Sequence, residues 1–472
     1  MKKRLLKTCM MLILGATALP MVTSCSKEVI PDFVMPEEGF DTNKKITIRF
    51  AHAMGQNLQN VLDAYLEDFK LMYPNITVVH NSIGSYNDIR DQMATALAAG
   101  GSDADIVYCY PDHVALYNQG QKVVTLDDLI NSEVTVYNGM TKEDEVIGLT
   151  QEQQDDFIDA YWGEGMAFGD DKMYSLPLSK SSEVLYYNKT FFDRHNLQVP
   201  TTWEEMEKVC AEIKAIPGCA DAIPLGYDSE SNLFITLCEQ YNSPYTSAEE
   251  GNHYLFNNPT NKAFVKWLKG WYDKGYITTK ALYGGYTSSL FTSTDAVRCY
   301  MCIGSSAGAT YQYSDANPFE VGIASIPQVD VEKHPAVISQ GPSLCLLRNK
   351  DPQQVLASWL LMKFLTTDSS FQASFSMESG YTPVLNSVFD IPVYQNFLDS
   401  ANGTSSAIAA LSVKACVEQR DMYYYSPAFV GSSEAREQVG NIISSVFLAQ
   451  GNIDEAIDAA FENAIDECMY SS

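Results

Sequence analysis

A regular alternation of short apolar strands and amphipathic helices early in the chain limits the fold more than any other feature of the sequence. Residues 46–50 alternate apolar and polar side chains, as a half-buried strand does, and residues 58–72 carry apolar side chains at helical spacing. Residues 76–79 and 106–109 have the pattern of further strands, with a helix over 89–97 between them. Because strands joined by helices pair in parallel, the pattern predicts a doubly wound α/β unit.

The same kind of pattern returns later, so we expect a second α/β region and, over 472 residues, two or three domains. The expected elements are a strand at 184–187, helices at 203–214 and 261–274, a strand near Cys299 and helices that begin at 433 and 453. Ligands of parallel sheets bind beyond the carboxyl ends of the strands. The loops at 52–56, 82–87 and 110–113 are therefore the first places to expect a site.

The N-terminus has the features of an export signal. A basic start is followed by an apolar run at residues 10–21, which is too short to span a bilayer. The next residues, Val22-Thr23-Ser24-Cys25, resemble the bacterial lipobox, in which the cysteine is diacylated and becomes the new N-terminus. We expect residues 1–25 to be a lipoprotein signal peptide and residues 26–43 to be a flexible tether to the outer face of the cell membrane. An ordinary secretory signal with a chance cysteine is the alternative.

Charge and motif content exclude several classes of partner. The formal net charge is −28, and loss of the basic signal makes it more negative still. Such a surface repels nucleic acid and anionic lipid, but an anionic small ligand is recognised by a local pocket rather than by net charge. The chain has no Walker A sequence, no H-E-x-x-H and no glycine fingerprint after its first strand, so we expect no cofactor and no metal.

Segments spread over nearly all of the mature chain resemble the extracellular solute-binding proteins of the maltose and glycerol-3-phosphate importers. The matching segments are residues 174–189, 200–205, 84–86, 341–344, 363–367 and 379–384. The resemblance implies a periplasmic-binding-protein type II-like fold, with two α/β lobes joined by a multi-segment hinge and a ligand cleft between them. It also implies the role: a monomeric, lipid-anchored capture subunit that hands a small solute to the transmembrane permease of an ABC importer, and not an enzyme.

The resemblance also implies where the lobes divide. Lobe 1 is expected to comprise residues 44–176 and 329–378, and lobe 2 residues 177–328 and 379–472. The chain is expected to cross between the lobes near residues 176–180, 325–328 and 379–383. A hinge made of several strands permits closure without repacking either core.

Site residues follow from the glycerol-3-phosphate branch of the family. The ligand-contacting tyrosines of its Gly-x-Tyr loop and Gly-Tyr-x-Pro turn match Tyr86 and Tyr381, and its carboxylate is matched loosely by Asp112. Serines and a glycine of that site fall at Ser181, Ser306 and Gly341.

Two positions depart from that branch. Residues 228–233 lack its tryptophan pair, and its phosphate-facing arginine falls at Phe429. Because the bidentate phosphate donor is missing, we expect a neutral carbohydrate or polyol, with Phe429 as a contact. Glycerol-3-phosphate or a glycerophosphodiester is the alternative. Tyrosine rings can stack on a sugar and bond it through their hydroxyls, and the expected ones are Tyr86, Tyr110, Tyr381 and Tyr425.

Other chemistries have weaker support. The sequence from Gly304 to Gly308 satisfies G-x-S-x-G with Ser306 at its centre, but the one later histidine, His334, follows too soon for a hydrolase triad. Cys299 and Cys302 lack further zinc ligands at a matching distance, so we expect core packing. Cys210 and Cys219 are the nearby pair to test as a disulfide. A surface hydrolase and an adhesin without a small ligand remain the competing classes.

Overall fold

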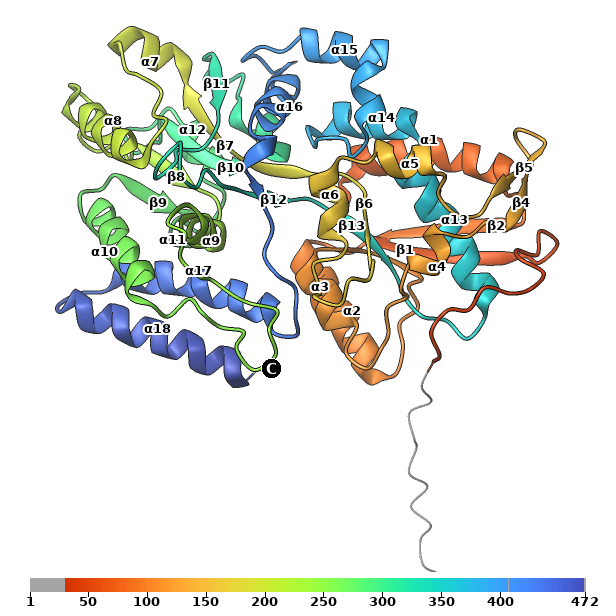
Figure 1. Cartoon of the computed structure of the whole chain (residues 1–472). Helices are drawn as coiled ribbons and strands as arrows, with labels where there is room; N and C mark the ends of the chain where they lie inside the picture. The colour runs from red at the N-terminus through yellow and green to blue at the C-terminus, as the bar shows by residue number, and fades with distance from the viewer. Residues whose placement is uncertain (1–29, 406, 471–472) are drawn as a thin grey trace, which may run out of the picture.

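The computed structural model describes residues 30–405 and 407–470, which form two lobes, each built around its own sheet (Figure 1). Lobe 1 holds a sheet in the order β2-β1-β3-β13-β6, and lobe 2 holds a sheet in the order β14-β12-β7-β10-β8-β9, with β11 paired to β7. Separate hydrophobic cores lie beside the two sheets. A two-stranded hairpin, β4 (Thr135–Asn138) and β5 (Glu143–Val146), accompanies lobe 1.

The sheet of lobe 1 has the parallel start that the sequence predicts. Its strand β1 (Ile46–His52) pairs in parallel with β2 (Ile76–Ser82) and β3 (Ile106–Cys109). The later strand β13 (Ser343–Leu346) runs antiparallel to β3, and β6 (Leu176–Pro177) forms the edge. The predicted strands and helices of residues 46–109 are confirmed, and the carboxyl ends of β1 and β3 face the loops that were expected to hold the site.

The sheet of lobe 2 is mixed. The long strand β7 (Ser181–Asn188) runs antiparallel to β10 (Met301–Ser305), β11 (Val321–Ala324) and β12 (Val337–Gln340). The strands β8 (Leu225–Tyr227) and β9 (Ile277–Thr279) continue from β10 in parallel, and β14 (Tyr423–Tyr424) pairs with β12.

Helices cover both sheets. Those around lobe 1 are α1 (Gln56–Met72), α2 (Tyr86–Ala99), α3 (Pro111–Tyr117), α4 (Asp127–Ile130), α5 (Gln151–Asp156), α6 (Asp159–Glu164), α13 (Pro352–Thr367), α14 (Ser369–Ser379) and α15 (Pro392–Asp399). Those around lobe 2 are α7 (Lys189–His195), α8 (Trp203–Ala215), α9 (Glu230–Gln240), α10 (Pro259–Asp273), α11 (Lys280–Tyr283), α12 (Ser288–Phe291), α16 (Ile408–Glu418), α17 (Ser432–Leu448) and α18 (Ile453–Tyr470). Short 3-10 turns lie at Ser306–Gln312, Asn386–Asp390 and Arg420–Met422.

The chain passes between the lobes at places that differ in part from the prediction. One crossing, between β6 and β7, lies where it was expected. The predicted crossing at 325–328 is wrong, because β12 still pairs with β7 and the chain leaves lobe 2 only at Gly341, which joins β12 to β13. The glycine has φ +107°, and a Cβ there would lie 2.5 Å from the Ser179 carbonyl oxygen, so a larger residue would push these crossings apart.

The segment after residue 379 also differs from the predicted division. Val384, Leu385, Val388 and Tyr394 pack in the core of lobe 1 rather than in lobe 2. The chain returns to lobe 2 with α16, whose Ile408 packs with residues of β7 and β10.

The described part of the predicted tether, residues 30–43, is also packed on lobe 1, because Phe33 and Phe40 are buried in its core and Asp32 pairs with Arg348. The prediction that this part is a flexible tether is therefore wrong, and the remaining lobe boundaries stay a prediction.

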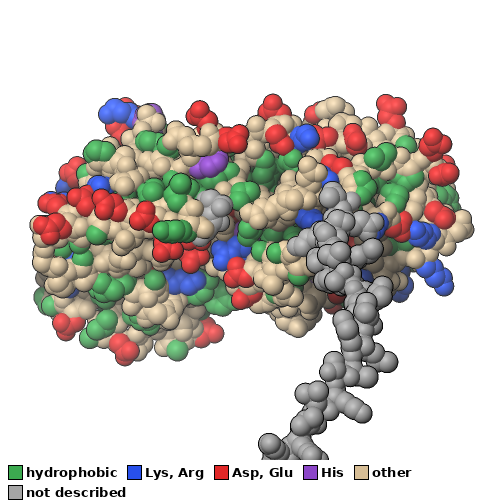
Figure 2. Space-filling view, turned by 90° about the horizontal axis from the view of Figure 1, so that it is seen from below, with side chains coloured by type: hydrophobic (Ala, Val, Ile, Leu, Met, Phe, Trp, Pro, Cys, Tyr) green, Lys and Arg blue, Asp and Glu red, His purple; other side chains and the backbone are tan. Residues whose placement is uncertain are grey.

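The surface fits the strongly negative charge of the chain. Figure 2 shows acidic side chains scattered over the visible face of both lobes. None of the helices formed by the described residues is both long and apolar enough to cross a membrane.

Candidate functional site

A large cavity lies between the lobes. We call it the main cavity; its volume is about 770 Å³, within the range of roughly 300–1,000 Å³ that is usual for small-molecule sites. It is lined by Ser85, Tyr86, Asn87, Tyr110 and Tyr381, and by Glu183, Asp228, Ser229, Asn232, Lys280, Tyr286, Ser288, Ser305, Ala307, Gly308, Tyr311, Gln312, Gln340 and Arg436. Both lobes contribute, so a solute held here touches both.

The wall from lobe 1 is aromatic. The Tyr86 ring stacks on Tyr110 with centroids 4.7 Å apart and planes 16° apart, and its hydroxyl lies 3.4 Å from the Tyr381 hydroxyl. Ser85 caps α2 through a capping box with Asp88, which fixes Tyr86 at the first position of the helix. Burial raises the pKa of Tyr86 well above its ordinary value, so its hydroxyl stays protonated and can donate to a solute.

The wall from lobe 2 is a hydrogen-bonded polar network. Glu183 accepts hydrogen bonds from the Tyr227 hydroxyl at 2.5 Å and from Asn232 Nδ2 at 2.9 Å. Asn232 Nδ2 also donates to Gln340 Oε1 at 2.8 Å, and Arg436 donates to Asn232 Oδ1. Burial raises the pKa of Glu183 to about 7, so this carboxyl changes charge near neutral pH.

Further charged and aromatic groups line the lobe 2 side. Asp228 accepts hydrogen bonds from the Thr287 backbone nitrogen and hydroxyl, each at 2.7 Å. The Lys280 ammonium lies 3.8 Å from the centre of the Tyr286 ring. Tyr286 and Tyr311 are 60% and 74% exposed, so their rings remain open to a solute.

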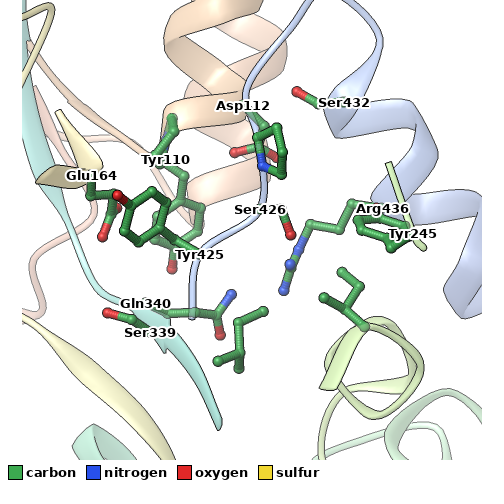
Figure 3. Close-up of a pocket in the computed structure, with 14 residues that line it drawn as sticks. Tyr110, Asp112, Glu164, Tyr245, Ser339, Gln340, Tyr425, Ser426, Ser432 and Arg436 are labelled. Atoms are coloured by element: carbon green, nitrogen blue, oxygen red, sulfur yellow. The ribbon is translucent and has the colours of Figure 1, made fainter. Parts of the chain in front are cut away.

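A smaller hollow of about 50 Å³ adjoins the main cavity (Figure 3). We call it the side pocket; it shares Tyr110, Gln340 and Arg436 with the main cavity. Buried polar atoms that have no hydrogen-bond partner among the described residues gather in it, and these belong to Asp112, Glu164, Ser339 and Ser426. Unpaired buried polar atoms are costly, so this pocket is suited to a polar group that can pair with them.

The structure brings together some of the predicted site residues. Tyr86 and Tyr381 line the main cavity, and so does Tyr110, whereas Asp112 and Tyr425 line the side pocket.

Other predicted residues lie behind the walls. Ser306 is fully buried and its hydroxyl accepts a hydrogen bond from the Ser182 backbone nitrogen at 3.3 Å. Ser181 and Gly341 belong to the crossing segments and do not line either cavity. Phe429 stacks on His253, with ring centroids 4.3 Å apart, and is not part of either lining.

Sequence reasoning missed three charged residues of the site, namely Glu164, Glu183 and Arg436. Glu183 directly precedes the strand predicted at 184–187, and Glu164 ends a short helix that was not predicted. Arg436 lies in a predicted amphipathic helix. It is the lone cation of residues 432–448, and this isolation is the signal that could have identified it.

The cysteines of the described residues are all buried. Cys210 and Cys219, the pair singled out to test as a disulfide, are both free, and the Cys219 sulfur lies 3.3 Å from the Tyr300 hydroxyl. Cys299 and Cys302 are buried in the core, as predicted. The described residues contain no group of three or more histidine, cysteine or carboxylate side chains that could hold a metal ion.

Comparison with known proteins agrees with this geometry. Residues 64–399 match the family model described as bacterial extracellular solute-binding protein. The sn-glycerol-3-phosphate-binding periplasmic protein UgpB of Escherichia coli (strain K12) is 22% identical over 375 residues, which cover 76% of this chain and 79% of that protein.

Solved structures share the fold. UgpB from Mycobacterium tuberculosis in complex with glycerophosphocholine superimposes with a TM-score of 0.68 at 15% identity, covering 90% of this chain and 98% of that one. The cyclic alpha-maltosyl-1,6-maltose binding protein from Arthrobacter globiformis superimposes with a TM-score of 0.66 at 17% identity, covering 90% and 99%. The predicted fold class, with two α/β lobes around a cleft, is confirmed.

Proposed function

The chain belongs to the family of bacterial extracellular solute-binding proteins, and from that premise we propose that it captures a carbohydrate or polyol outside the cell and delivers it to the permease of an ABC importer. The observation that carries the proposal is the main cavity, which sets the stacked Tyr86 and Tyr110 rings opposite the Glu183–Asn232–Arg436 network. Rings pack on the C–H faces of a polyol, while the network offers donors and acceptors to its hydroxyls.

A phosphorylated polyol is the second candidate, because two cations line the main cavity. The preference for a neutral solute rested on Phe429 standing at the position of the family's arginine. Arg436, from α17, and Lys280 both line the cavity, so cationic donors are available from other elements. A guanidinium is well suited to bind a phosphate through paired hydrogen bonds. UgpB of Escherichia coli, by its name, binds such an ester.

The binding proposal is tested by calorimetry and thermal unfolding with maltose, maltotriose, glycerol, sn-glycerol 3-phosphate and sn-glycero-3-phosphocholine. We expect saturable one-to-one binding of at least one of them, with the solute recovered unchanged. A solute at 100 times its Kd stabilises the folded chain by about 2.7 kcal/mol. Conversion of a solute to product would instead support the hydrolase class, and no binding of any solute would favour an adhesin.

The role as a binding protein rather than an enzyme has its own test. Ser306 stands at the centre of the G-x-S-x-G sequence, yet its hydroxyl is buried and engaged by the Ser182 backbone. We expect a fluorophosphonate probe to leave the protein unlabelled. Stoichiometric labelling that Ser306→Ala abolishes would contradict the binding role.

The lipid anchor rests on Cys25, which lies outside the described residues. We expect Cys25→Ser to release the protein from the membrane fraction, because no helix of the described residues could hold it there by spanning the bilayer. Membrane retention of this variant at the level of the wild type would show that Cys25 is not the attachment site.

A further inference from the structure

One buried lysine lies in the crossing between β6 and β7 and contacts two further segments beside it. The Lys180 ammonium is fully buried and donates to the Ser343 hydroxyl at the start of β13, at 3.1 Å, and to the carbonyl of Gly341 between β12 and β13, at 3.4 Å. Its backbone pairs with Thr382 in both directions, at 2.9 and 2.6 Å. The position of Lys180 is therefore tied to the relative placement of these segments.

The partner of this lysine connects the hinge to the side pocket. Glu164 Oε1 lies 2.8 Å from the Lys180 ammonium, and the Glu164 side chain is 3% exposed. Its other oxygen, Oε2, is buried and has no hydrogen-bond partner among the described residues. Glu164 lines the side pocket, where Figure 3 shows it on the same side as Tyr110 and Tyr425. One oxygen of this carboxylate is thus paired with Lys180, and the other is a buried, unpaired acceptor in a residue that lines the side pocket.

We propose that Glu164 Oε2 accepts a hydrogen bond from the bound solute and that the Glu164–Lys180 ion pair makes closure of the hinge depend on this contact. The inference rests on the proposed solute-binding function and adds a contact that the family resemblance does not assign to any residue of this chain.

The chemistry of the side pocket defines which group of the solute Glu164 can bind. A carboxylate oxygen only accepts, so the solute must donate, through a hydroxyl or an ammonium. A volume of about 50 Å³ leaves room for one such group rather than for a sugar ring. The Arg436 guanidinium also lines the side pocket, but it donates its hydrogen bond to Asn232 in the lobe 2 wall of the main cavity. A solute that fills the main cavity can therefore reach Glu164 with one end.

The contact is tested with Glu164→Gln, which keeps an oxygen for Lys180 but replaces the second acceptor by an amide that donates. The probes are maltose, sn-glycerol 3-phosphate and sn-glycero-3-phosphocholine. For a probe that the wild type binds, we expect tenfold or greater loss of affinity and a smaller decrease in radius of gyration on binding.

The hinge link is tested without any solute by a matched pair of buried lysines. Lys363 donates to the Val146 and Gly148 carbonyls inside lobe 1, far from the crossings. Spin labels at Asp68→Cys on α1 and Glu212→Cys on α8 report the distance between the lobes, since the described native cysteines are buried. We expect Lys180→Met to broaden that distance distribution and Lys363→Met to leave it unchanged.

The outcomes separate the two proposals. A wild type that binds none of the probes counts against the proposed function. A wild type that binds and compacts, with Glu164→Gln doing the same at equal affinity, overturns this inference alone. If Lys180→Met does not fold, Ser343→Ala is used instead, because it removes one of the hydrogen bonds to Lys180. We expect Ser343→Ala to broaden the distance distribution by less than Lys180→Met would. No broadening overturns the hinge link.

Discussion

The two walls of the main cavity are built from different chemistry. Lobe 1 presents rings, with Tyr86 stacked on Tyr110 and its hydroxyl next to Tyr381. Lobe 2 presents a network in which Glu183 and Arg436 are joined through Asn232. Rings contact any solute with apolar faces, whereas the network fixes the directions of donors and acceptors. From this difference we propose that lobe 1 supplies general affinity and that lobe 2 decides which solute is accepted.

The largest effect is expected behind the walls, at the Glu164–Lys180 ion pair beside the crossing segments. Lys180→Met leaves Glu164 buried without its cation, and breaking a buried ion pair in this way costs about 3–5 kcal/mol of folding stability. Urea denaturation followed by circular dichroism measures the change. A loss below about 1 kcal/mol would show that the Glu164–Lys180 ion pair contributes little to the stability of the fold.

The lobe 2 wall should make the folding stability depend on pH, through Glu183. The pKa of Glu183 is raised from 4.5 to about 7, so the folded state holds this proton more tightly than the unfolded state does. Stability from this group is therefore full below pH 4.5 and falls by about 3 kcal/mol as the pH rises to 7. Glu183→Gln should remove that part of the pH dependence, measured as the difference between the two unfolding profiles. Identical pH profiles for the two proteins would contradict the raised pKa.

The lobe 1 wall should act on every solute alike. Tyr381→Ala removes a ring and the hydroxyl that faces Tyr86, and we expect a loss of about 1–3 kcal/mol, roughly tenfold or more in affinity. Calorimetry with a sugar and with a phosphate ester should give similar losses for each solute that binds. A loss confined to one class of solute would reverse the assignment of affinity to lobe 1.

The smallest effect is expected at Phe429, which stacks on His253 outside the cavity lining. Phe429→Leu should change solute affinity by less than about twofold, within the scatter expected of a residue that makes no contact. Titration by calorimetry tests this, with the Tyr381→Ala protein measured beside it. A loss as large as that of Tyr381→Ala would place Phe429 in the site after all.

The contrast between the walls also explains what the sequence could predict. The lobe 1 wall follows strands and helices with strong periodicity, and Tyr86, Tyr110 and Asp112 lie where ligands of parallel sheets are expected. The Gly-Tyr-x-Pro turn led to Tyr381 by resemblance to the family. Local pattern and strand order were sufficient on this side.

The lobe 2 wall could not be found in the same way. Glu183, Asn232 and Arg436 come from a strand and two helices that are far apart in the sequence, and only the mixed sheet brings them together. The sequence predicted the strand at 184–187 and the helix from 433, but gave no reason to place Glu183 or Arg436 at a ligand, and it did not predict the helix that carries Asn232. The crossing at Gly341 was misplaced for a related reason: the short strand β12 gives no signal of the lobe to which it belongs.

The most direct test of the account is a pair of titrations on the wild type and on Arg436→Gln, each with a neutral sugar and with sn-glycerol 3-phosphate. If lobe 2 selects the solute, the wild type binds one class clearly better, and Arg436→Gln alters the ratio of the two affinities by tenfold or more. The direction of that change tells whether the cation serves a phosphate. An unchanged ratio in a folded variant, or a wild type that binds neither class, would contradict the claim that this cavity selects and carries a solute.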